Sequence, residues 1–95
     1  MSKSWVVNLS NRVLKCEGRL SEKMQGTFRK LVTQLTDYGM PKDFSHYGAL
    51  PQKGPDVYHC HLNNGRPTYV VIWTTNKTSK CIDILFLGTH EKARY

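Results

Sequence analysis

The chain has 95 residues, with 14 lysines and arginines against 7 aspartates and glutamates, giving a net charge of +7 and a pI near 9.5. A chain of this length is expected to form one domain, residues 1–95, around one modest core. Its hydrophobic fraction of 39% is typical of a globular protein and excludes a disordered one. No apolar run approaches the roughly 20 residues of a membrane span.

The positive charge is spread over both halves of the chain, so it belongs to the folded body rather than to a tail. Such a surface favours a polyanionic partner, either nucleic acid or an acidic protein segment. Solubility alone is the alternative explanation, and charge does not separate the two.

The cysteines indicate a reducing compartment. Cys16, Cys60 and Cys81 are odd in number and lack C-x-x-C spacing, unlike the disulfide frameworks of small secreted domains. The first residues are too polar for a signal peptide. We therefore expect a cytoplasmic protein without a membrane partner.

The first predicted elements are a strand and a short helix. Residues 4–9 place Trp5, Val7 and Leu9 on one face with the period of two of a strand. Residues 11–18 are expected to form a short helix, with Ser10 as its N-cap.

An amphipathic helix is the strongest pattern in the chain. Ser21 is placed to cap its start, and Gly39 followed by Pro41 ends it. Its apolar stripe is expected to face the core, with Phe28 and Leu31 buried. The stripe recurs at helical spacing and consists of Met24, Phe28, Leu31, Val32 and Leu35.

A long loop and a strand meander follow. Residues 41–55 are rich in Pro, Gly and polar residues and predict a loop of about fifteen residues, a length that is often functional. Strand patterns cover residues 57–62, 68–75 and 81–87, joined by an Asn-Gly turn at 63–66 and a polar turn at 76–79. The tail, residues 88–95, follows the last strand directly. We predict an α+β domain with an N-terminal strand, two helices and a three-stranded antiparallel meander packed on the longer helix.

Two histidines share one face of the first meander strand. Strand alternation places Val57, His59 and His61 on one face and Cys60 on the other, with the two histidine Cβ atoms about 7 Å apart. His90 leaves the end of a neighbouring strand and is placed to reach the same surface. A solvated strand face with no further role is the alternative reading of these histidines.

Histidine near neutral pH both accepts and donates a proton, which suits RNA cleavage. RNA carries its own nucleophile, the 2′-OH, so cleavage requires a base, a cation beside the phosphorane and an acid for the leaving oxygen, with no metal or other cofactor. Lys53 or Arg66 is placed to supply the cation, and Tyr95 or Tyr69 a surface for base stacking. The catalytic candidates are His61, His90, His59 and His46, and the RNA-binding candidates are Tyr95, Arg66, Lys53, Lys92 and Arg94.

A zinc site is the competing chemistry. His59-x-His61 with His90 and His46 offers enough nitrogen donors. Cys60, however, is turned away from the histidines by the strand period, and no carboxylate lies at ligand spacing. On the face predicted for the core, the Cys60 thiol is expected to act as a small hydrophobe rather than as a nucleophile.

Three segments together resemble the RelE/ParE superfamily, the cytotoxic translational repressors of bacterial type II toxin–antitoxin systems. They are Tyr58-His-Cys-His-Leu, Gly65-Arg-Pro-Thr-Tyr-Val-Val-Ile-Trp73 and Gly88-Thr-His-Glu-Lys-Ala-Arg-Tyr95. The resemblance covers the whole chain in element order. It implies a RelE-like fold and an mRNA endoribonuclease that acts in the ribosomal A site, leaves 2′,3′-cyclic or 3′-phosphate ends and is neutralised by a cognate antitoxin.

The resemblance also implies roles for individual residues. His61 matches the strand histidine of the YafQ-like branch and His90 its C-terminal histidine, while Tyr95 falls near the terminal aromatic. His46 lies near a further histidine of that branch. RelE itself has lysines where His59 and His61 stand.

Two departures from the family pattern stand out. The acid that YafQ-like toxins place just after the strand histidine has no counterpart in the turn at residues 63–65. Arg66 is shifted from the usual strand arginine.

Two other functions fit the same composition. A ParE-type toxin that poisons DNA gyrase without catalysis would need no histidine cluster, and neither would a basic nucleic-acid-binding adaptor. In both cases His61 and His90 would be dispensable.

Overall fold

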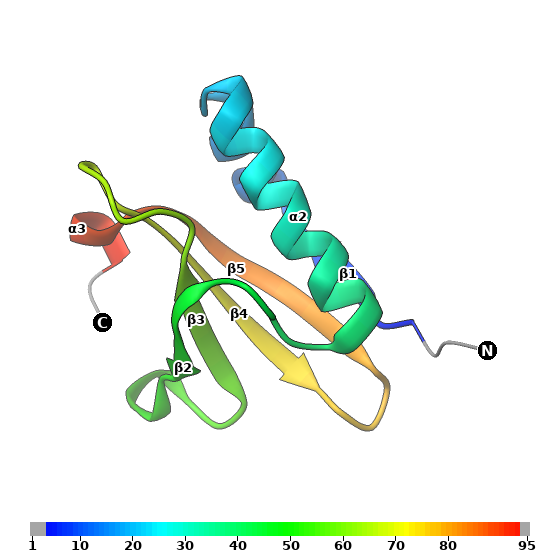
Figure 1. The fold of residues 1–95 in the computed structure, drawn as a ribbon. Helices are drawn as coiled ribbons and strands as arrows, with labels where there is room; N and C mark the ends of the chain where they lie inside the picture. The colour runs from blue at the N-terminus through cyan, green and yellow to red at the C-terminus, as the bar shows by residue number, and fades with distance from the viewer. Residues whose placement is uncertain (1–3, 94–95) are drawn as a thin grey trace.

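The structure, a computed structural model, describes residues 4–93. Five strands form one mixed sheet: β1 (Val6–Leu9), β2 (Ser45–Ala49), β3 (Val57–His61), β4 (Tyr69–Asn76) and β5 (Cys81–Thr89), in the order β1-β5-β4-β3-β2 (Figure 1). β1 runs parallel to β5, and all other neighbours are antiparallel. The predicted α+β class and the antiparallel meander are therefore confirmed.

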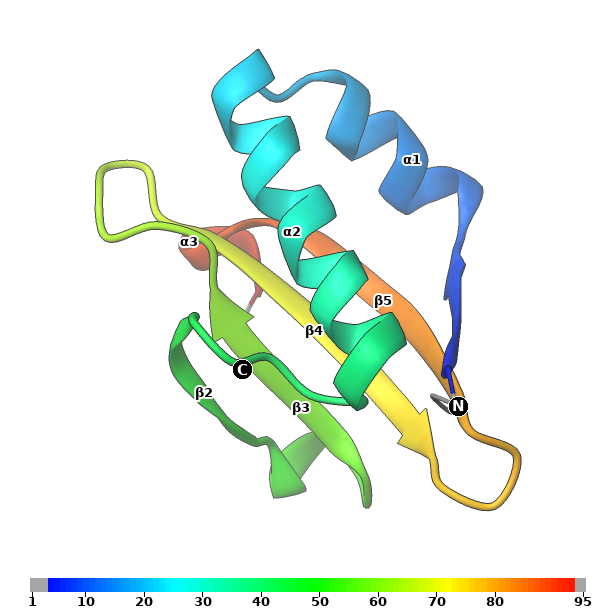
Figure 2. The ribbon, with the colours of Figure 1, turned by 45° about the vertical axis from the view of Figure 1, so that its right-hand side comes forward.

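Two helices, α1 (Asn11–Gly18) and α2 (Glu22–Tyr38), connect β1 to the rest of the sheet. Both caps are as predicted, since Ser10 Oγ accepts a hydrogen bond from the Val13 amide and Ser21 Oγ one from the Met24 amide, each at 3.2 Å. Figure 2 shows α2 crossing the sheet and α1 running back beside it.

Gly39 ends α2 in the left-handed conformation, with φ of 75°. A Cβ atom at this position would lie 2.5 Å from Trp5 Cε2, so the site requires glycine for space as well as for conformation. The close approach ties the end of α2 to the segment that precedes β1.

The larger core lies between the helices and one face of the sheet. Phe28 and Leu31 are fully buried there, as predicted, and Trp73 packs with them from β4. Trp5, Val7 and Leu9 pack against the same cluster, so the alternation predicted for the first strand is correct.

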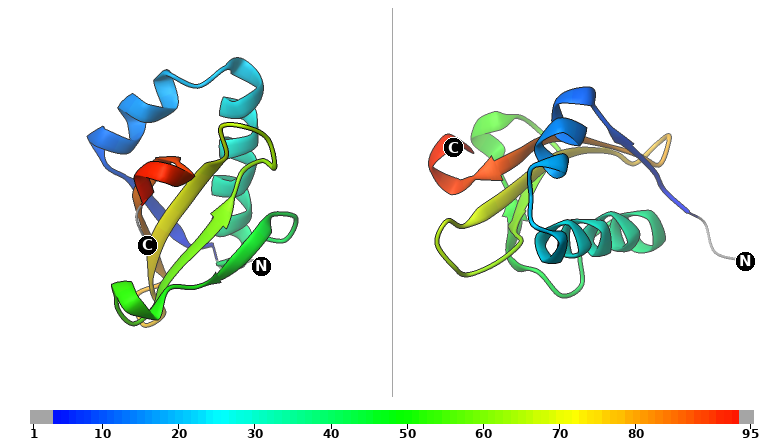
Figure 3. Two further views of the ribbon diagram at one scale, coloured as in Figure 1. Left: turned by 90° about the vertical axis from the view of Figure 1, so that its left-hand side faces the viewer. Right: turned by 90° about the horizontal axis from the view of Figure 1, so that it is seen from above.

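A smaller apolar cluster occupies the opposite face of the sheet. Val57, Val70 and Ile72 are buried beneath Leu50 and Ala93, the latter from a short helix, α3 (His90–Ala93). Figure 3 shows α3 at the end of β5, away from α1 and α2. This second face, left open by the long helices, also carries the side chains of His59 and His61.

The predicted loop at residues 41–55 is the main error in the expected fold. It contains the edge strand β2 and a 3₁₀-helix, η1 (Pro51–Lys53). The sequence Ser-His-Tyr-Gly-Ala has no strand alternation, and β2 forms because β3 offers it a free edge for pairing. The last strand also extends through Thr89, and the tail then turns into α3 rather than continuing as an irregular end.

No helix within residues 4–93 is long and apolar enough to cross a membrane. The three cysteines are free thiols.

Candidate functional site

Four histidines from three segments meet on the open face of the sheet, with His61 at the centre. The His46 ring stacks on the His61 ring, with centroids 4.1 Å apart, and the His90 ring meets His61 edge-on at 5.4 Å. His59, two residues earlier on β3, lies 6.3 Å from His61. The predicted grouping of these four residues is therefore found in the structure.

An irregularity in β2 places His46 in this cluster. Ser45 pairs with His61 and Gly48 with His59, so two residues of β2 oppose one of β3. His46 occupies this bulge with φ of 58°, a conformation that few side chains adopt and that histidine tolerates better than most. Because the strand is bent there, the His46 ring lies over His61 instead of following the regular alternation.

A hydrogen bond fixes the orientation of His59. Its Nδ1 lies 3.1 Å from the carbonyl oxygen of Gly48, and a carbonyl only accepts hydrogen bonds, so Nδ1 carries the proton. In the neutral ring this leaves the lone pair on Nε2. Gly48 also leaves room for the ring, since a Cβ added there would lie 4.0 Å from His59 Cε1.

The cluster disfavours protonation of its inner members. Burial lowers the pKa of His61, and the neighbouring His46, His90 and His59 lower it further. Burial also lowers the pKa of His59, with smaller contributions of the same sign from His46 and His90, while the hydrogen bond to Gly48 opposes them. Both rings are therefore held in the neutral, proton-accepting form.

These shifts predict an acid-sensitive fold. A histidine whose pKa is lower in the folded than in the unfolded chain binds fewer protons when folded, so stability is lost as the pH falls through the unfolded pKa of about 6.5. We expect the melting temperature to fall between about pH 7.5 and about pH 5.5. The His59→Gln, His61→Gln double variant should show a clearly flatter profile. An unchanged profile would contradict the lowered pKa values.

The predicted RNA-binding residues are more dispersed than the histidines. Lys53 is exposed in η1, before the start of β3, and Arg66 is exposed in the connection after its end. Tyr69, the alternative stacking residue, packs against the core on the helix-covered face, so it lies on the wrong side of the sheet. Arg94 and Tyr95 lie outside the described residues.

Lys92, the third predicted RNA-binding residue that the structure describes, lies in α3. It lines a groove between α1 and β5 together with Arg12 and Arg19. Sequence reasoning missed these two arginines. Together with Cys16 and Leu20, the two arginines recur at helical spacing, four, seven and eight residues after Arg12. This pattern would have revealed a basic and apolar face along α1 and the turn that follows it.

The donor set does not converge as a metal site. Within residues 4–93, no group of three or more His, Cys, Asp or Glu side chains is arranged to hold a metal ion. The His46 and His61 rings are 20° from parallel and stacked face to face, and metal ligands point their nitrogens at a common centre instead.

Cys60 has the environment predicted for it. It is fully buried under the helices, and burial raises the pKa of its thiol to about 12. The neutral thiol is a poor nucleophile and packs as an apolar side chain.

Comparison with known proteins shows similarity at the level of the structure but not of the sequence. No protein-family model matches the sequence, and no curated protein matches it. The structure is similar to a chain of the archaeal RelE–RelB complex from Pyrococcus horikoshii OT3, with a TM-score of 0.72 and 22% identity over 98% of this chain and 100% of that one. It is also similar to a mutant of the Escherichia coli toxin RelE in the free state, with a TM-score of 0.69 and 14% identity over 96% of this chain and 88% of that one.

A third similar structure is that of a conserved hypothetical protein from Helicobacter pylori, with a TM-score of 0.59 and 17% identity over 94% of this chain and 98% of that one. The resemblance noted in the sequence is thus confirmed at the level of the fold, across nearly the whole chain. This protein has the fold of the RelE toxins.

Proposed function

We propose that this protein is the toxin of a toxin–antitoxin pair and a metal-independent endoribonuclease that cleaves mRNA, in the ribosomal A site. The observation that carries the proposal is the convergence of four histidines around His61 on an open sheet face of a basic protein. The RelE fold supports the same reading.

The cluster supplies both proton transfers that RNA cleavage requires. The lowered pKa of His61 keeps its ring neutral, so His61 is assigned as the base that takes the 2′-OH proton. His90 lies 5.4 Å from His61 and is exposed at the start of α3, so it is assigned as the acid that protonates the leaving 5′-oxygen. Because the two rings are in edge-to-face contact, a phosphodiester lying across their exposed edges would meet both the base and the acid.

His59 and His46 contribute by holding the cluster together. His59 is fixed by Gly48, and His46 covers one face of His61. Of the two candidate cations, Arg66 is the better placed, because it follows the end of β3 that carries His61. Lys53 lies before the opposite end of the same strand.

The net charge of +7 supports RNA as the substrate, since phosphate contacts dominate the affinity of proteins for nucleic acid. A cognate antitoxin is the proposed protein partner. The similar archaeal RelE was solved as a complex with RelB, which supports a partner of this kind here.

Cleavage in the presence of a chelator tests the chemistry. After dialysis of the purified protein against EDTA, we expect it to cut mRNA on ribosomes at an unchanged rate in magnesium buffer with a zinc-selective chelator. The products should carry 2′,3′-cyclic or 3′-phosphate ends, because the histidines supply both proton transfers. End analysis by phosphatase sensitivity and mass spectrometry distinguishes these products. Chelator-sensitive cleavage that leaves 3′-OH ends would instead indicate a metal-activated water.

A further inference from the structure

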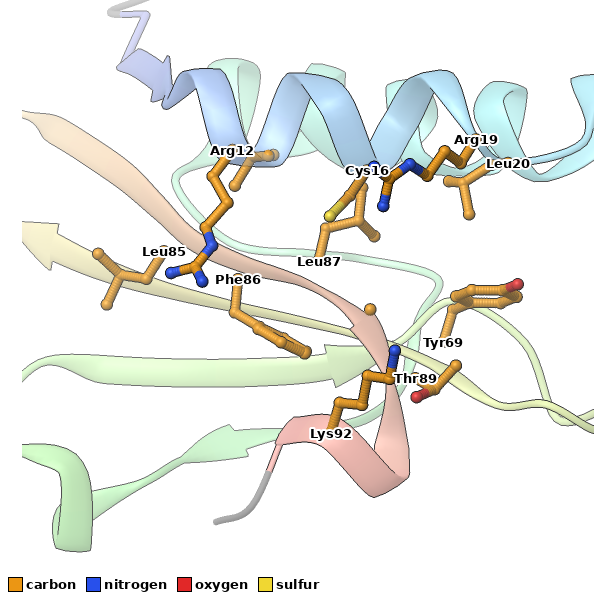
Figure 4. Close-up of a pocket in the computed structure, with 12 residues that line it drawn as sticks. Arg12, Cys16, Arg19, Leu20, Tyr69, Leu85, Phe86, Leu87, Thr89 and Lys92 are labelled. Carbon is orange, nitrogen blue, oxygen red and sulfur yellow. The ribbon is translucent and has the colours of Figure 1, made fainter.

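A groove of about 600 Å³ lies between α1 and the second half of β5, outside the histidine cluster (Figure 4). Arg12, Cys16 and Leu20 come from the α1 side. The other side, the floor of the groove, is lined by Leu85, Phe86 and Leu87 of β5. At its far end the groove reaches Thr89 and Lys92. A volume of this size accommodates several side chains of a bound segment.

The charges around the groove have one sign. Three of its twelve lining residues are cations, Arg12, Arg19 and Lys92, and none is an acid. None of the three cations forms an ion pair with another described residue, whereas the neighbouring Arg29 is paired with Glu17. These three cations are therefore available to pair with the negative charges of a ligand.

The floor is apolar, which distinguishes the groove from a simple phosphate-binding surface. Leu85, which lines this floor, is 51% exposed. Cys16, Leu20 and Phe86 add further partly covered apolar surface. An RNA backbone would leave such a floor uncovered, whereas a peptide with apolar side chains would fill it.

The edge of β5 is also open here. β1 pairs with β5 only up to Ile84, after which the chain leaves the sheet and enters α1. From Leu85 to Thr89, β4 is the one strand of the described chain that pairs with β5. An extended segment laid along this edge would continue the sheet in line with β1 and gain backbone hydrogen bonds.

We propose that this groove binds an extended, acidic protein segment in which apolar side chains alternate with aspartate or glutamate. The apolar side chains cover Leu85 and Phe86, and the carboxylates face Arg12, Arg19 and Lys92. The inference deepens the proposed function and rests on it for the source of the segment, which is the neutralising partner.

One end of the groove adjoins the histidine cluster along the chain. The groove ends at Thr89 and Lys92, and His90 lies between them in the chain. A segment that contacts Thr89 and Lys92 in the groove therefore lies next to His90, the proposed acid of the reaction.

A titration followed by NMR tests this proposal without measuring cleavage. The probe is a short synthetic peptide in which leucine and valine alternate with glutamate, added to the isotope-labelled full chain. We expect amide shifts concentrated at residues 12–20 and 85–92. A second peptide with glutamine in place of each glutamate should bind at least about tenfold more weakly, because it loses the charge attraction.

Charge reversal provides the matched comparison. Arg12→Glu with Arg19→Glu should weaken the acidic peptide at least about tenfold, whereas Lys23→Glu with Lys77→Glu, equal in charge but outside the groove, should have little effect. Leu85→Ser, at an exposed position, should also weaken binding without unfolding the chain.

Three results would overturn the inference. The first is amide shifts centred outside residues 12–20 and 85–92. The second is equal affinity of the protein for the acidic and the glutamine peptides. The third is that a single-stranded RNA displaces the acidic peptide and itself binds more weakly to the Arg12→Glu, Arg19→Glu variant. A protein that fails to cut RNA but binds the peptide in the groove would refute the proposed chemistry alone.

Discussion

His61→Ala and His90→Ala are each expected to lower the rate of RNA cleavage at least about 100-fold, because one general acid or base contributes roughly 10²–10⁴-fold. His61 is the residue that all three other histidines contact or approach, and His90 is the exposed ring that meets it edge-on. Cleavage is measured as the initial rate on mRNA bound to ribosomes, and toxicity as growth after induction.

The controls separate chemistry from folding. Lys77→Ala, in the exposed turn after β4, should leave cleavage unchanged. The His61→Ala and His90→Ala proteins should retain the circular dichroism spectrum of the parent and its binding to the cognate antitoxin. If the His61→Ala, His90→Ala double variant still arrests growth while transcripts stay intact, the histidines are not catalytic. DNA breaks in those cells would favour a gyrase-directed toxin.

Phe28→Ala is expected to destabilise the fold by about 3–5 kcal/mol, the usual cost of truncating a fully buried phenylalanine. Phe28 has no exposed surface and packs between α2 and the sheet with Leu31 and Trp73. The loss combines the transfer of the ring to water with the cavity that it leaves. Urea unfolding followed by tryptophan fluorescence measures it.

A second aromatic residue on the same helix is the matched control. Tyr38 lies in the last turn of α2 and is 56% exposed, so Tyr38→Ala should change stability by less than about 1 kcal/mol. Equal losses for the two variants would mean that α2 does not pack on the sheet through its Phe28 face.

Much of the fold was predictable because its signals are local. The stripe through Phe28 and Leu31 repeats at the helical period, and the caps at Ser10, Ser21 and Gly39 depend only on neighbouring backbone groups. The face shared by His59 and His61 follows from strand alternation in the same way. That these two rings face away from the helices was therefore determined by the sequence.

The rest depended on contacts between distant segments. β2 has no strand pattern of its own and forms against the edge of β3, where a bulge carries His46 onto His61. Tyr69 was expected beside the histidines but faces the helices, because its face is set by the register of β4.

The groove likewise exists only because β1 stops pairing at Ile84 while β5 continues to Thr89. Local sequence determines periodicity and caps, since these involve residues within one turn or one strand. Strand register, bulges and open edges are decided by the tertiary structure, because they depend on which remote backbone is available to pair.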